Sequence, residues 1–93
     1  MIVTPLCRLL GIKYPILQGG MAWAASPELA AAVCNAGGLG ILGAGDMPAE
    51  AVRRELRRLR TLTDQPFGAN VPLFTEGTRL TLQVFVEERV PVV

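Results

Sequence analysis

The chain has 93 residues, 51% of them apolar, which is enough to bury one core, and its nine basic and eight acidic residues nearly cancel. This balance gives no general attraction to nucleic acid or to a membrane surface, and the sequence lacks histidine, the most frequent acid–base catalyst and metal ligand. Cys7 and Cys34 stand alone in apolar surroundings, as expected for buried free thiols in a reducing compartment. The longest uncharged run, residues 29–45, is too short to span a bilayer, and the N-terminus shows no secretory pattern, so we expect a cytoplasmic protein with no membrane partner.

The first half of the sequence predicts two helices and two strands. Leu6, Leu9 and Leu10 indicate a short helix that ends at Gly11, and a brief buried strand follows over residues 14–18. The run Ser26-Pro27-Glu28 is typical of a helix start, because it supplies a hydroxyl cap, a proline at the first position and a carboxylate in the first turn. We expect that helix to end at Gly37, and a second apolar strand to occupy residues 38–42.

The second half continues the same alternation. Asp46 and Pro48 open a helix in which Val52, Leu56 and Leu59 form one apolar stripe. The remaining elements are a strand, a helix and the start of a further strand, at residues 66–71, 77–89 and 90–93. Strands that alternate with helices form parallel βαβ units, which are compatible with an open doubly wound sheet and with a (β/α)8 barrel. Because a whole barrel needs roughly 250 residues, a barrel here would be only its first part.

Gly38, Gly40 and Gly43 have the spacing of the dinucleotide-binding pattern G-x-G-x-x-G. That pattern needs its glycines after a strand and at the start of a helix, so that the pyrophosphate meets the helix N-terminus. Here the glycines precede and lie inside the strand, while the next helix begins only near Pro48. We therefore interpret them as positions of close helix–strand packing, and leave open that residues 43–45 border a ligand.

Arginines dominate the face of the second-half helix opposite its apolar stripe, at Arg53, Arg54, Arg57, Arg58 and Arg60. We expect this face to be solvated, with Glu50 forming an ion pair with Arg54 one turn later. Nucleic-acid binding would call for interleaved aromatic residues, and the sequence has none there.

Residues 15–23 run from a short apolar strand into paired glycines, Gly19-Gly20, followed by Met21 and Trp23. Paired glycines after a strand let the backbone come close to a ligand, because no Cβ intervenes. Met21 and Trp23 fit either ordinary core or the wall of a pocket.

Two strands end in a side-chain amide, the first at Gln18 and the third at Asn70. The carboxyl ends of parallel strands form the active face of such folds. An amide both donates and accepts hydrogen bonds, so Asn70 could pair with the edge of a pyrimidine-like ring. The alternative for Asn70 is a capped turn before Pro72.

These segments resemble the nitronate monooxygenases, once called 2-nitropropane dioxygenases, and the related FMN-dependent enoyl-ACP reductases. The resemblance rests on Pro15-Ile16-Leu17-Gln18-Gly19-Gly20-Met21-Ala22, Asn35-Ala36-Gly37-Gly38-Leu39-Gly40 and Leu62-Thr63-Asp64-Gln65-Pro66-Phe67-Gly68-Ala69-Asn70, in order along nearly the whole chain. It implies an α/β fold, a TIM (β/α)8 barrel with an inserted smaller domain, that binds FMN at the carboxyl ends of its strands. Residues 1–93 would then be a single partial domain, the N-terminal part of that barrel, with about three βα units and the start of a fourth strand, and with the remainder of the barrel absent.

Carried over residue by residue, the resemblance implies cofactor-binding positions at Gln18, Gly19, Gly20, Met21, Ala22 and Asn70. The backbone of Gly20, Met21 and Ala22 would lie along the flavin ring, Asn70 would hydrogen-bond its polar edge, and Gln18 would lie beneath or beside it. The family's catalytic histidine and its phosphate-binding loops lie in later segments, so no catalytic residue and no metal ligand is assigned here. One departure is Ala69, where the family usually has valine.

The activity that the resemblance implies is that of an FMN-dependent oxidoreductase, most closely a nitronate monooxygenase that oxidises alkyl nitronates with FMN and O2. One alternative is an FMN-dependent enoyl-ACP reductase that uses NAD(P)H, and another is a non-catalytic fragment or a subunit that completes another chain's barrel. The partners would be a small-molecule substrate, a nitronate or an enoyl thioester, and a second copy or a complementing chain. We expect the 93-residue chain alone to be inactive and to bind FMN weakly or not at all.

Overall fold

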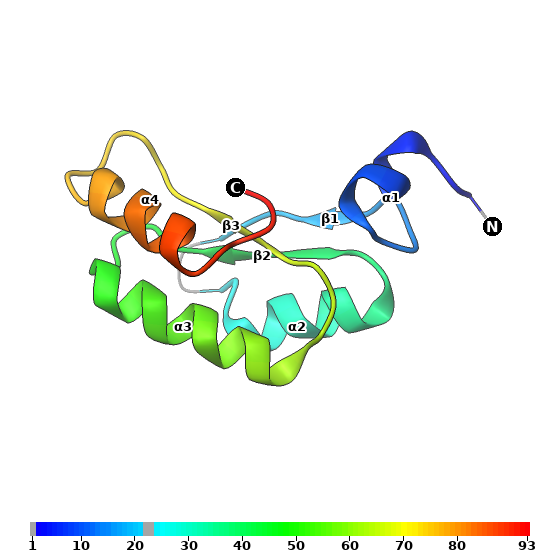
Figure 1. Cartoon of the computed structure of the whole chain (residues 1–93), viewed down its shortest axis with the longest axis horizontal. Coiled ribbons are helices and arrows are strands. Elements are labelled where there is room, and N and C mark those ends of the chain that lie inside the picture. The colour runs from blue at the N-terminus through cyan, green and yellow to red at the C-terminus, as the bar shows by residue number, and fades with distance from the viewer. Residues whose placement is uncertain (1, 22–23) are drawn as a thin grey trace.

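The computed structural model describes residues 2–21 and 24–93, and its strands form one parallel sheet in the order β1-β2-β3. The elements in chain order are α1 (Pro5–Leu10), β1 (Leu17–Gln18), α2 (Pro27–Ala36), β2 (Leu39–Gly43), α3 (Ala49–Leu62), β3 (Gly68–Asn70) and α4 (Thr78–Glu87) (Figure 1). The predicted parallel α/β organisation is therefore confirmed.

The helix boundaries follow the capping residues of the sequence. Ser26 accepts a hydrogen bond from the Leu29 N–H at 3.3 Å and so begins α2, as predicted. Gly11 and Gly37 end α1 and α2 with φ of 70° and 108°, values at which a side chain would be strained. The start of α3 differs from the prediction: the helix begins at Ala49 without a side-chain cap, and Asp46 lies in a left-handed turn with φ of 62°.

The strands are shorter than the sequence predicted. The expected strand over residues 14–18 is reduced to β1, because the N–H groups of Lys13 and Tyr14 both donate to the carbonyl of Gly37 in a turn. The expected strand over residues 90–93 is a single parallel bridge between Gly68 and Val92. The parallel strands are joined by few backbone hydrogen bonds, so the packing of the helices must supply most of the stability of the fold.

One face of the sheet is covered by α2, α3 and α4, and the main core lies between them (Figure 1). The predicted stripe on α3, Val52, Leu56 and Leu59, is fully buried in this core. The buried residues of α4 are Thr81, Val84 and Phe85, whereas the equally apolar Leu80 and Val86 are exposed. The other face of the sheet, here called the open face, carries a small buried cluster of Cys7, Ile12 and Leu39, against which Leu10, Ile41 and Val92 pack.

Gly40 allows α2 to lie close to β2, because a Cβ at this position would overlap the backbone carbonyl of Ala30. Its N–H donates to the Cys34 Sγ at 3.3 Å, and burial raises the pKa of that thiol. The interpretation of this glycine as a helix–strand packing position is confirmed. Both cysteines are free and buried, as predicted.

The arginine face of α3 is more organised than a solvated surface. Glu50 pairs with Arg53 at 3.2 Å and not with Arg54, so the predicted partner was wrong. Arg53 is only 20% exposed, because it also reaches Glu87 at 2.7 Å and Glu88 at 3.0 Å on the last turn of α4. Arg57 also pairs with Glu88, and its hydrogen bond to this carboxylate lowers the pKa of Glu88 below the ordinary value. These ion pairs fasten α4 to α3.

Candidate functional site

The backbone leaves the sheet directly after Gln18 and crosses the open face of β2. Leu39, Ile41 and Gly43 alternate onto that face, and Gly43 has no side chain to fill it. A Cβ at Gly43 would stand 2.7–3.0 Å from the backbone N, C and O atoms of Met21. The segment of residues 19–21, here called the crossing segment, therefore lies directly on Gly43.

The crossing segment contacts Asn70 at Gly20. A Cβ on Gly20 would stand 2.5 Å from the Asn70 Oδ1, 2.7 Å from its Cγ and 3.1 Å from its Nδ2. Asn70 is the neighbour of Gly43 in the β2–β3 register, so its side chain lies on the open face too. Because Gly20 and Gly43 have no side chains, the backbone that follows β1 can cross β2 and contact the Asn70 side chain on β3.

Asn70 ends β3 with an exposed side chain. Its backbone carbonyl accepts a hydrogen bond from the Ala44 N–H at 3.3 Å, which fixes the end of the strand. Among residues 2–21 and 24–93, no hydrogen bond engages the side-chain amide. Within these residues, neither of its N–H donors nor its carbonyl oxygen has a hydrogen-bond partner.

Gln18 is held at the edge of the sheet. Its Nε2 donates to the carbonyl oxygen of Ile41 at 3.1 Å and to that of Gly19, and its Oε1 accepts from the Ile41 N–H at 3.2 Å. These contacts use both N–H donors of the amide and leave one acceptor position free.

The remaining predicted positions after Gln18 differ in what surrounds them. Gly19 is exposed, and among the described residues a Cβ there would meet nothing within 4 Å, so packing against these residues does not require a glycine. Met21, the last residue of the crossing segment, is 47% exposed. Ala22 and Trp23 lie outside the described residues. The structure thus brings Gly20, Met21 and Asn70 together, with Gly19 open to an incoming group.

These residues suit a flat aromatic cofactor such as FMN. Bare backbone at Gly19 and Gly20, a polarisable thioether and an unpaired amide can follow a planar ring and pair with its polar edge. Among residues 2–21 and 24–93, no three His, Cys, Asp or Glu side chains are grouped to hold a metal ion. Within the same residues, no helix is long and apolar enough to cross a membrane.

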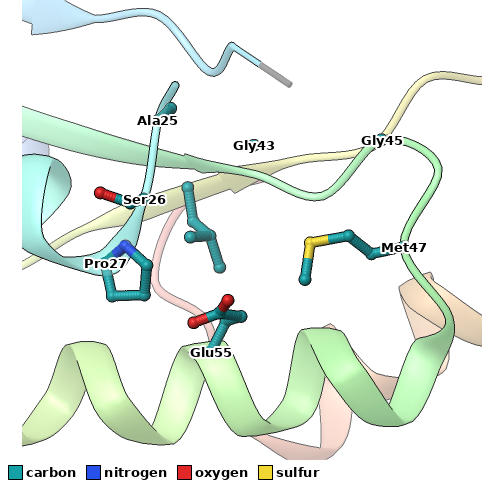
Figure 2. Close-up of a pocket in the computed structure, with 8 residues that line it drawn as sticks. Ala25, Ser26, Pro27, Gly43, Gly45, Met47 and Glu55 are labelled. Carbon is teal, nitrogen blue, oxygen red and sulfur yellow. The ribbon is translucent and has the colours of Figure 1, made fainter. Parts of the chain in front are cut away.

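A cavity of about 190 Å³ lies on the opposite, helix-covered side of β2 (Figure 2). It is lined by Pro27 from the start of α2, by Met47 and by Glu55 from α3, whose carboxylate points into it in Figure 2. The Gly20–Asn70 contact lies on the other face of the sheet, so this cavity is separate from the candidate site.

A second cavity, of about 480 Å³, lies between the loops that follow β2 and β3. Some of the residues that line it were not singled out in the sequence. Phe74 lines it at 91% exposure, and the adjacent Leu73 is 83% exposed. The hydroxyl of Thr78 donates to the carbonyls of Pro72 at 2.7 Å and Thr75 at 2.8 Å, which ties the loop down. The signal in the sequence was an apolar pair immediately after a proline-terminated strand.

Comparison with known proteins identifies relatives over nearly the whole chain. The profile of the family described as nitronate monooxygenase matches residues 3–83. A nitronate monooxygenase of Paraburkholderia phytofirmans is 58% identical over 66 residues, which are 71% of this chain and 18% of that protein.

Two solved structures are similar in fold and sequence. The structure of FabK from Thermotoga maritima superposes with a TM-score of 0.97 and 47% identity, covering 99% of this chain and 30% of that chain. A nitroalkane oxidase from Streptomyces ansochromogenes gives a TM-score of 0.80 and 33% identity, covering 96% of this chain and 35% of that chain. The chain therefore spans about a fifth to a third of the length of these relatives.

Proposed function

The chain belongs to the nitronate monooxygenase family, and from this membership we propose that it forms the N-terminal part of an FMN-dependent oxidoreductase built on a (β/α)8 barrel. In that barrel, β1, β2 and β3 are neighbouring parallel strands, α2, α3 and α4 belong to the outer layer, and the open face points inward. The carboxyl ends of the strands, where Asn70 and the crossing segment lie, are then the active face.

The observation that carries this proposal is the contact between Gly20 and the exposed side-chain amide of Asn70. The backbone that follows β1 contacts the Asn70 side chain at Gly20 and lies on Gly43 at Met21, at the end of the sheet where α/β enzymes bind their cofactors. An ordinary strand-end turn does not need so close an approach, since a Cβ on Gly20 would stand 2.5 Å from the Asn70 Oδ1.

The proposed roles of the residues follow from their geometry. Asn70 donates to and accepts from the polar edge of the flavin ring, while the backbone of Gly20, Met21 and Ala22 lies along the ring. Gly19 leaves room for that approach, since no atom of residues 2–21 or 24–93 lies within 4 Å of a Cβ at this position. FMN, when bound, supplies the electron-transfer chemistry, and the protein holds and orients it.

For the substrate we propose an alkyl nitronate, as in the family to which the chain belongs. The test uses the longest natural polypeptide that carries residues 1–93, purified with FMN. Under anaerobic conditions, propyl-2-nitronate should bleach the flavin absorbance near 450 nm, and admission of O2 should restore it. A flavin that a nitronate leaves oxidised would exclude this substrate class.

A second candidate is an FMN-dependent enoyl-ACP reductase. It is favoured by the closer superposition of the chain on FabK than on the nitroalkane oxidase. In the same preparation, this candidate predicts that NADH or NADPH reduces the flavin and that a crotonyl thioester reoxidises it without O2. Reoxidation by the thioester combined with inertness to nitronates would replace the first candidate by the second.

A subunit that completes another chain's barrel is the non-catalytic alternative. Such a partner would cover apolar side chains that are exposed in this chain. They are Leu17 and Met21 on the open face of the sheet, and Leu73 and Phe74 after β3. Sedimentation velocity distinguishes this case, because the chain alone would then associate with a separately encoded polypeptide in a fixed ratio. A monomer that mixes with such a polypeptide without change in sedimentation argues against it.

A further inference from the structure

Every second residue of β2 presents its backbone groups to the β1 side of the sheet, and each is paired differently. The Leu39 N–H donates to the carbonyl of Ile16 at 2.9 Å, which is an ordinary rung of the parallel ladder. The Gly43 N–H donates at 3.2 Å to the carbonyl of Ala25, beyond the crossing segment. Between these two positions lies Ile41, whose backbone groups would be unpaired once β1 has ended at Gln18.

The side chain of Gln18 fills this missing rung. Its Oε1 accepts from the Ile41 N–H at 3.2 Å, and its Nε2 donates to the Ile41 carbonyl at 3.1 Å. A primary amide has the same donor and acceptor as a peptide group, so it can replace a residue of backbone in the ladder. The remaining N–H of the amide donates to the carbonyl of Gly19, the first residue of the crossing segment.

This substitution frees the main chain after Gln18. Because the side chain satisfies Ile41, the backbone of residues 19–21 can leave the edge of β2 without an unpaired buried N–H or C=O group. It can then lie on Gly43 and reach Asn70, as the crossing segment does. The bond to Gly19 fixes the direction in which the chain departs.

We propose that Gln18 is a positioning residue whose side-chain amide substitutes for a rung of the β1–β2 ladder and thereby sets the crossing segment against Asn70. Its amide faces Ile41 and Gly19 and acts on the ligand through Gly20 and Asn70. This proposal rests on the proposed function for its meaning, since the crossing segment is the wall that a flavin would contact, but its test needs no flavin.

The first test uses the unmodified 93-residue chain and two glutamines as an internal comparison. Gln83 on α4 is exposed and has no hydrogen bond among the described residues, so its side-chain NH2 protons exchange with solvent as in a free amide. In a ¹⁵N-resolved exchange experiment, we expect the Gln18 side-chain protons to exchange at least about 5-fold more slowly, the factor for one hydrogen bond. Equal rates for the two glutamines would overturn the proposal without any variant.

The second test uses Gln18→Met, which keeps the length of the side chain but removes both hydrogen-bonding groups, with Gln83→Met as the matched control. The Ile41 amide should exchange about 5-fold faster in Gln18→Met, and the nuclear Overhauser contact between Gly20 Hα and the Asn70 side-chain amide should weaken or vanish. Gln18→Glu keeps an acceptor for the Ile41 N–H and loses both donors, so the Gly20–Asn70 contact should weaken while the Ile41 amide remains partly protected.

A merely structural role would lower stability in the Gln18 variants and leave the Gly20–Asn70 contact intact in the molecules that stay folded. That result would overturn the proposal, as would an unchanged Ile41 exchange rate. Failure of the proposed function is a separate outcome: a protein that binds no FMN but shows the protected Gln18 amide retains the positioning role.

Discussion

Gly20→Ala would place a methyl group where the side chain of Asn70 now lies. The new Cβ would stand 2.5 Å from the Asn70 Oδ1, whereas ordinary van der Waals contact needs 3.4–4 Å. One of the two groups must move by about 1 Å, and Asn70 is the group with room to do so, since its side chain is exposed.

The expected cost to stability is small. Turning Asn70 to another orientation costs about 0.5–1.5 kcal/mol if it leaves its preferred rotamer. Gly20 is not in the left-handed region, so an alanine is unstrained there and gains about 0.4–1 kcal/mol from the unfolded state. The two effects nearly cancel, and we expect the thermal midpoint to stay within about 5 °C of the unmodified chain.

The expected effect on the Asn70 amide is large. Its side-chain resonances in a ¹H–¹⁵N spectrum should shift in Gly20→Ala and stay in place in Gly19→Ala, whose added methyl meets no atom of the described residues, Asn70 included, within 4 Å. Circular dichroism gives the thermal midpoint of the same samples. A Gly20→Ala chain with unshifted Asn70 resonances, or with a midpoint lowered by more than about 10 °C, would refute the described contact, because the backbone and not the amide would then have moved.

Gly40→Ala should lower the free energy of unfolding by about 1–3 kcal/mol in urea titrations, because the new methyl group overlaps the backbone of Ala30; an unchanged urea midpoint would contradict this packing. The pKa of Glu88 is lowered in the folded chain by the hydrogen bond from Arg57, so this carboxylate stabilises the fold above its ordinary pKa of 4.5 and ceases to do so as the pH falls through its lower folded value. Stability measured from pH 7 to pH 2 should therefore fall less steeply in Arg57→Met, and parallel curves would argue against the ion pair. Titration of the 93-residue chain with FMN should quench the fluorescence of Trp23, the single tryptophan, weakly and without saturation, because one wall of a site holds the cofactor poorly; stoichiometric quenching would contradict this expectation.

The helices were predictable because their signals are local. The cap at Ser26, the stops at Gly11 and Gly37 and the stripe from Val52 to Leu59 act within one or two turns of chain, and each is found as expected. The strands were predicted too long, because their ends depend on partners distant in sequence. The sequence around Tyr14 predicts a strand, but in the structure the Tyr14 N–H donates to the carbonyl of Gly37 in a turn.

For the candidate site, the sequence singled out residues that the structure places near one another, but not the contacts between them. Paired glycines and strand-end amides mark Gly19, Gly20 and Asn70, but no local pattern says that Gly20 contacts Asn70 or that Met21 lies on Gly43. Nor does it say that Gln18 turns back to pair with Ile41, because that contact joins residues 23 positions apart. The partner of Glu50 was predicted wrongly for the same reason. Glu87 and Glu88 at the end of α4 bind Arg53, and the sequence of α3 alone does not contain these residues.

The most direct test of a flavin site at Asn70 places residues 1–93 in a complete barrel, in exchange for the segment of Thermotoga maritima FabK that they match. The folded chimaera should bind FMN at one per chain, and Asn70→Ala should weaken that binding about tenfold through the lost hydrogen bonds to the ring, whereas Gln83→Ala should leave it unchanged. A folded chimaera that takes up no FMN, or one whose FMN affinity is the same with and without the Asn70 amide, would contradict the account.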